Sequence, residues 1–181
     1  MALRLWEATT ILREDSQAEF RASVTNVSTF IATGAGTGLS PRAPGTVGSL
    51  FGLVCFWLLP ESPLVYLWVT WGIVTLLGIG SAQRAGGTWG VTDHPAIVID
   101  EVIGMWLALL LPLTLLPFDV SLWPLSLFAF IAFRAYDILK PWPVNVLERR
   151  VPGGLGVVLD DVMAGAMAGV VVTLILIVSA T

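Results

Sequence analysis

The chain has 181 residues, of which 56% are hydrophobic and only 12% are charged. An average soluble domain is roughly 25% charged, so this composition indicates an integral membrane protein and excludes an ordinary soluble or disordered chain. The formal net charge of −4 comes without a basic patch, and nothing therefore points to a nucleic acid partner.

The chain is predicted to contain an arm and one domain. Residues 1–30 mix charged and apolar side chains, which predicts a soluble or surface-lying helical arm. Residues 31–181 are predicted to form a single membrane domain, because no linker or internal repeat divides them and one domain is the default at this length.

Residues 33–49, TGAGTGLSPRAPGTVGS, are too rich in glycine and proline to be regular helix throughout. The backbone amides of Gly34, Gly36 and Gly38 are candidates for binding a phosphate, with Arg42 as a charged partner. The P-loop pattern is absent. A plain turn before the first membrane helix is the simpler alternative.

Five apolar runs follow, at residues 46–60, 64–80, 97–117, 122–136 and 157–180. A membrane-spanning helix needs about 20 residues, so the first and fourth runs are short for a full crossing. We therefore expect an all-α fold: a compact helical integral membrane protein with four or five membrane-embedded helices.

The basic residues predict the orientation of these helices. If all five runs cross, the nine Lys and Arg residues fall on one side, whereas the opposite loops carry only Glu61 and Asp119. By the positive-inside rule the basic side is cytoplasmic. The polar residues that open or close the apolar runs lie on the same side, so we expect the polar clusters at the cytoplasmic face.

Two acidic pairs stand at the start of apolar runs, Asp100 with Glu101 and Asp160 with Asp161. Carboxylates at the edge of a membrane span are costly and typically mark a proton, metal or substrate site. Carboxylates from two helices suit a hard divalent cation such as Mg²⁺. The simpler alternative is that each acid stabilises its own helix N-terminus through the helix dipole.

A third cluster spaces Arg134, Asp137 and Lys140 at three-residue intervals, which places them on one helical face. It suits a site in which Asp137 joins the metal while the two cations bind phosphate oxygens, although a structural ladder of ion pairs is a fair alternative. His94, beside Asp93, is a supporting candidate for a general acid or proton shuttle.

Missing motifs narrow the chemistry. Cys55 and His94 are the only residues of their types, so cysteine-phosphatase and two-histidine phosphatase chemistry are both unsupported. Metal-assisted attack by water remains. Two rivals stay open: a small ion-coupled transporter, whose site would be expected near the bilayer midplane between repeated halves, and a non-catalytic membrane scaffold, which would leave the clustered acids unexplained.

Four segments together resemble the bacterial phosphatidylglycerophosphatase A family: TGAGTGLSPRAPGTVGS, DHPAIVIDEVIG, FRAYDILKPWP and GGLGVVLDDVMAG. They occur in family order and extend over residues 33–165. The resemblance implies a compact helical, magnesium-dependent phosphatase of the bacterial cytoplasmic membrane. Its substrate would be phosphatidylglycerol phosphate, whose terminal phosphate it would remove from the cytoplasmic side.

The hypothesis for the site combines these clusters. One or two Mg²⁺ ions would be bound by the candidate catalytic and metal residues, which are Asp100, Glu101, Asp137, Asp160 and Asp161. The phosphate would be bound by Gly34, Gly36, Gly38, Arg42, Arg134 and Lys140, with Asp93 and His94 in support. At least one acid would orient or deprotonate the attacking water.

Overall fold

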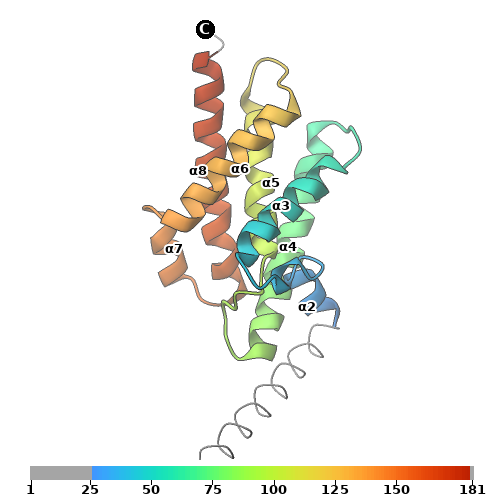
Figure 1. The fold of residues 1–181 in the computed structure, drawn as a ribbon, viewed down its shortest axis with the longest axis vertical. Coiled ribbons are helices and arrows are strands. Elements are labelled where there is room, and N and C mark those ends of the chain that lie inside the picture. The colour runs from blue at the N-terminus through green and yellow to red at the C-terminus, as the bar shows by residue number, and fades with distance from the viewer. Residues whose placement is uncertain (1–25, 180–181) are drawn as a thin grey trace, which may run out of the picture.

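The computed structural model describes residues 26–179, and within these residues all regular structure is helical. The elements, coloured along the chain in Figure 1, are α2 (Val27–Ala32), the 3₁₀ helix η1 (Thr37–Leu39), α3 (Pro44–Trp57), α4 (Leu64–Trp89), α5 (Ile99–Leu115), α6 (Leu122–Leu139), α7 (Val144–Arg150) and α8 (Gly153–Ser179). The predicted all-α class is confirmed. Of the predicted arm, residues 1–25 lie outside the described residues, and residues 26–30 cap and begin α2.

Each of the five apolar runs forms one helix, α3, α4, α5, α6 or α8. Three of these, α4, α6 and α8, are long and apolar enough to cross a membrane. The fourth run gains length because α6 continues to Leu139, whereas α3 and α5 have 14 and 17 residues. The four or five predicted membrane-embedded helices thus correspond to three helices long enough to cross a membrane and two shorter helices packed among them.

Helix α5 lies in the middle of the bundle, between α8 on one side and α3 and α4 on the other (Figure 1). It is buried from Val102 to Leu110 without a break. Within the described residues, three indole N–H groups link α5 to its neighbours: Trp106 Nε1 donates to the Gly52 carbonyl of α3 at 2.7 Å, and Trp71 Nε1 and Trp68 Nε1 of α4 donate to the Ile103 carbonyl and to Thr114 Oγ1, both at 3.0 Å. A fourth, Trp57 Nε1, links α3 to α6 by donating to Ser126 Oγ at 2.9 Å.

Small residues bring α5 and α8 close together. A Cβ added to Gly165 would overlap the carbonyl oxygen of Gly104, and one added to Gly104 would lie 2.6 Å from the carbonyl oxygen of Asp161. Such backbone contact is how helices associate in a membrane, where lipid removes most of the hydrophobic driving force and close van der Waals packing takes its place. The contact sets Asp161 directly beside the first turns of α5.

The two ends of the bundle differ. The loops before α4 and before α6 lie at the end where α8 finishes, while the glycine-rich loop and the segment before α5 lie at the other end (Figure 1). The second end carries the acidic pairs, as the alternating topology predicted.

Candidate metal and phosphate site

Three carboxylates meet where α5 begins. Asp100, Glu101 and Asp161 each offer an oxygen within 4.8 Å of the others, and we call these three the carboxylate cluster. Asp100 and Asp161 are buried, and all three have a buried oxygen without a hydrogen-bond partner: Asp100 Oδ1, Glu101 Oε2 and Asp161 Oδ2. Three like charges so close repel one another unless a cation balances them. Unpaired oxygen ligands on three carboxylates suit a hard divalent ion.

The cluster arises from local and tertiary packing together. Asp100 and Glu101 occupy the first turn of α5, where the helix dipole favours negative charge. The start of α5 is fixed from outside, because the Val98 N–H donates to the Ala32 carbonyl at 2.8 Å and Gly38 packs against the Ala96 carbonyl. Asp161 then comes from α8 across the glycine contact.

Two ion pairs border the cluster. Arg134 Nη1 donates to Asp137 Oδ2 at 2.5 Å and to Ser49 Oγ at 3.3 Å. Lys140 Nζ donates to Asp160 Oδ2 at 2.9 Å, which ties the end of α6 to α8. The three-residue spacing therefore gave the Arg134–Asp137 pair, whereas Lys140 pairs with an acid from another helix.

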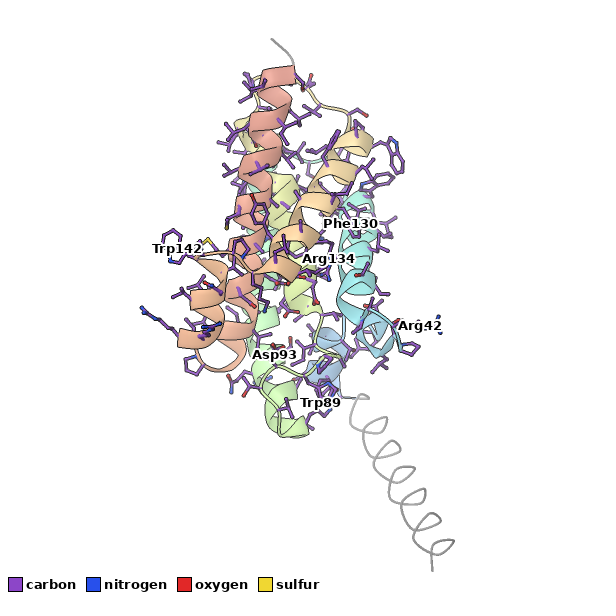
Figure 2. All side chains as sticks on the ribbon, turned by 60° about the vertical axis from the view of Figure 1, so that its left-hand side comes forward. Arg42, Trp89, Asp93, Phe130, Arg134 and Trp142 are labelled. Atoms are coloured by element: carbon purple, nitrogen blue, oxygen red, sulfur yellow. The ribbon has the colours of Figure 1, made fainter. Side chains whose placement is uncertain are left out.

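The carboxylate cluster and the two ion pairs line one cavity of about 400 Å³, which we call the acidic cavity. Eight of the predicted site residues lie on its wall: Asp93, Asp100, Glu101, Arg134, Asp137, Lys140, Asp160 and Asp161. They come from α5, α6, α8 and the segment before α5. Figure 2 shows Arg134 and Asp93 on the same side of the molecule, between α8 and α3.

Arg42 is not brought to this cavity. Its side chain is exposed and extends away from the rest of the molecule (Figure 2). It is absent from the wall of the acidic cavity.

Gly34, Gly36 and Gly38 are also absent from the wall of the acidic cavity. The N–H groups of Gly34, Gly36 and Gly38 already donate to backbone carbonyls, those of Ile31 and Thr33. Gly34 and Gly36 have positive φ angles of 52° and 92°, which glycine adopts readily. This arrangement gives the three glycines a role in folding the loop onto the start of α5 and leaves no free amide among them for a phosphate.

His94 belongs to the loop before α5. Its ring packs on Trp89 with centroids 4.8 Å apart, and its Nδ1 accepts the Ala96 N–H at 3.1 Å. Burial lowers the pKa of His94, against an opposing effect of the Asp93 carboxylate. The wall of the acidic cavity includes Asp93 but not His94, so this geometry gives no support to a proton shuttle.

The sequence reading missed Gly45 and Thr46. Both lie in the first turn of α3 and line the acidic cavity. A Cβ on Gly45 would overlap Glu101 Oε1 and lie 3.3 Å from Arg134 Nη1, so only glycine lets α3 approach the two side chains this closely. The sequence did carry a signal, the Pro44-Gly45 pair at the start of an apolar helix. Proline is common at the first helical position, but the helix itself does not need the glycine that follows, so this glycine calls for another reason.

The arrangement combines a place for a divalent ion with cations able to bind an anion. Metal, phosphate and water could meet in the acidic cavity, whose wall carries the carboxylate oxygens together with Arg134 and Lys140. These are the requirements of metal-assisted phosphoryl transfer to water.

The comparisons agree with this chemistry. The family model described as Phosphatidylglycerophosphatase A matches residues 30–176. The chain is 35% identical to phosphatidylglycerophosphatase A of Escherichia coli K12 over 88% of this chain and 90% of that protein, and 35% identical to the Haemophilus influenzae protein of the same name over 84% and 90%. A Bacteroides thetaiotaomicron protein, whose name carries a provisional assignment as a phosphatidylinositol-3-phosphatase, is 37% identical over 79% of this chain and 89% of its own length.

No solved structure matches the chain significantly. The family match extends over the carboxylate cluster, both ion pairs and the first turn of α3. The chain therefore belongs to the phosphatidylglycerophosphatase A family.

Proposed function

We propose that this protein is a magnesium-dependent phosphatidylglycerophosphatase, which hydrolyses the terminal phosphomonoester of phosphatidylglycerol phosphate to phosphatidylglycerol and inorganic phosphate. The observation that carries the proposal is the carboxylate cluster facing Arg134 and Lys140 in one cavity of a helical membrane protein of this family.

Asp100, Glu101 and Asp161 would bind the first Mg²⁺, because one oxygen of each lies within 4.8 Å of the others and each residue has a buried oxygen without a hydrogen-bond partner. Bound Mg²⁺ supplies Lewis acidity to the phosphoryl group and lowers the pKa of a coordinated water. Asp137 and Asp160 lie on the same cavity wall. They are held by Arg134 and Lys140, and so they would contribute from the rim, either to a second ion or to the attacking water.

The cations would bind the phosphate that is transferred. A guanidinium carries five donors, so Arg134 can bind phosphate oxygens while it keeps its bond to Asp137. Lys140, the residue that caps the C-terminal end of α6, lines the same cavity. The free N–H groups of the first turn of α3, at Gly45 and Thr46, add the positive end of a helix dipole.

A carboxylate on the cavity wall would accept the proton of the attacking water, which must lie on the side of the phosphorus opposite the leaving glycerol oxygen, and that oxygen would leave as the alcohol by taking a proton from water. Asp137 and Asp160 are the candidates, since the other three acids would be occupied as metal ligands. Arg134 and Lys140 would then balance the charge that develops on the phosphoryl oxygens.

The protein would lie in the bacterial cytoplasmic membrane with the acidic cavity facing the cytoplasm. Arg149 and Arg150 line a cavity that shares Asp93 and Asp160 with the acidic cavity, and by the positive-inside rule this basic end would face the cytoplasm. The headgroup would enter from the cytoplasmic leaflet while the acyl chains stay in lipid. The transporter alternative gains no support, because Asp100 and Glu101 lie in the first turn of α5 and the acids come from α5, α6 and α8, with no repeated halves among the described helices.

The test is phosphate release from phosphatidylglycerol phosphate by detergent-purified protein, with Mg²⁺ and with excess chelator. We expect release only with Mg²⁺. Asp161→Asn should lower kcat on the order of 100-fold or more, because a lost metal ligand removes several kcal/mol of transition-state stabilisation. Asp119→Asn, an exposed acid in the loop before α6, is the matched control and should be unaffected. Unchanged turnover in Asp161→Asn would overturn the site.

A further inference from the structure

A second cavity of about 460 Å³ lies beside the acidic cavity. Arg149 and Arg150, at the end of α7, form part of its wall, together with the first residues of α8. Asp93 and Asp160 line both cavities. We call the second one the arginine cavity, and the shared residues make it a direct neighbour of the metal site.

The arginine cavity has the character of an anion site. Arg149 and Arg150 are exposed, and within the described residues no ion pair joins either of them to a carboxylate. The N-terminal turn of α8, at Gly153 and Gly156, lines the same space and brings the positive end of a long helix dipole. The acids on this wall are Asp93 and Asp160, and Asp160 is already paired with Lys140.

The depth of the cavity fits the lipid headgroup region. At the corner between α6 and α7, Trp142, Leu139 and Ile138 are 76%, 76% and 69% exposed. Exposed aliphatic residues next to a tryptophan are typical of the boundary between lipid and water. Figure 2 shows Trp142 pointing outward from this corner, away from Arg134 and Asp93. Helix α7 follows directly, so its arginines lie close to the level at which lipid phosphates lie.

We propose that Arg149 and Arg150 bind the phosphodiester of the same lipid whose terminal phosphate lies in the acidic cavity. The inference rests on the proposed function and deepens it. The headgroup of that lipid carries two phosphate groups joined by one glycerol. Two adjacent cavities, each with cationic side chains, therefore provide one site for each phosphate. The arginine cavity then selects lipids with a diester in addition to the monoester, and it holds the product until the diester is released.

The test is steady-state kinetics of the double variant Arg149→Gln/Arg150→Gln in neutral detergent micelles with phosphatidylglycerol phosphate as substrate. Each exposed charge-assisted contact contributes modestly, so we expect KM to rise about tenfold for the pair while kcat stays within about twofold. Inhibition by phosphatidylglycerol, which has the diester alone, should weaken by a similar factor. Inhibition by inorganic phosphate should not change.

Controls separate this inference from folding and from the proposed function. Arg84→Gln removes an exposed arginine that lines neither cavity and should leave KM unchanged. Arg149→Lys/Arg150→Lys keeps the charge and should recover part of the affinity. Equal melting temperatures in detergent would show that the glutamine variant is folded.

Three results would overturn the inference. One is an unchanged KM in the glutamine variant. Another is weaker inhibition by inorganic phosphate alone, which would assign the cavity to free phosphate. The third is a large loss of kcat at constant KM, which would place the arginines in the chemical step. Absence of phosphate release by the unaltered protein would instead refute the proposed function.

Discussion

Gly45→Ala offers the sharpest test of the site geometry. The added methyl group would overlap Glu101 Oε1 and press on Arg134 Nη1 at 3.3 Å. Glu101 Oε1 is the end of a flexible side chain, so the carboxylate can rotate away while both helices stay in place. To restore an ordinary contact it must retreat by roughly 1 Å, and a misplacement of about 1 Å at a reacting centre costs on the order of 100-fold in rate.

Although Gly45→Ala should lower the rate, it should leave the stability of the protein unchanged or raise it. Alanine is favoured over glycine within a helix by up to about 1 kcal/mol, and the φ angle of Gly45 is not among the positive ones. We therefore expect a melting temperature equal to or above that of the unaltered protein. The kcat should fall by about 100-fold, and the Mg²⁺ concentration that gives half of the maximal rate should rise.

The assay is phosphate release over a Mg²⁺ titration, with thermal unfolding measured in the same detergent. Gly80→Ala is the matched control, because Gly80 also lies in a helix but its added methyl group would meet no atom within 4 Å. If Gly45→Ala kept its rate and its Mg²⁺ dependence within twofold, Glu101 could not be a ligand in the position described, and the reasoning from the close approach of α3 would fail.

Three further substitutions test the packing of the helices and the predicted role of His94. Gly165→Ala forces a methyl group onto the backbone carbonyl of Gly104, which cannot rotate away, and should destabilise the protein by about 1–3 kcal/mol in thermal unfolding; an unchanged melting temperature would contradict the close packing of α5 and α8. Trp106→Phe leaves the Gly52 carbonyl without its indole donor and should cost about 1–3 kcal/mol by the same measurement, whereas a neutral result would mean that water replaces the bond. His94→Gln should keep kcat within about twofold across pH, since proton transfer by a residue in the reaction would contribute at least 100-fold; a large loss of rate would restore the proton shuttle.

Much of the fold could be predicted because its signals are local. Apolar runs long enough to be helices, ended by prolines and glycines, located all five major helices, since a membrane requires internally hydrogen-bonded segments wherever the chain is apolar. The acidic pairs and the Arg134–Asp137 spacing were likewise visible, because ionised groups in an apolar run need a functional or structural reason and residues three apart share one helical face.

The roles within the acidic pairs depended on tertiary packing. Adjacent helical residues point about 100° apart, so the sequence could not say which acid of each pair joins the metal site. The contact between Gly104 and Gly165 sets the rotation of α8 that puts Asp161 in the carboxylate cluster and leaves Asp160 to Lys140. In α5 both acids join the cluster.

The glycine-rich segment shows the same division. Its composition determined that the chain must turn there. Only the folded structure decided that the amides of Gly34, Gly36 and Gly38 are used within the loop, and that Gly45 packs directly against Glu101. Composition and spacing fix what a segment can form by itself, whereas the partner of each polar group is set by contacts between elements distant in sequence, which no local pattern specifies.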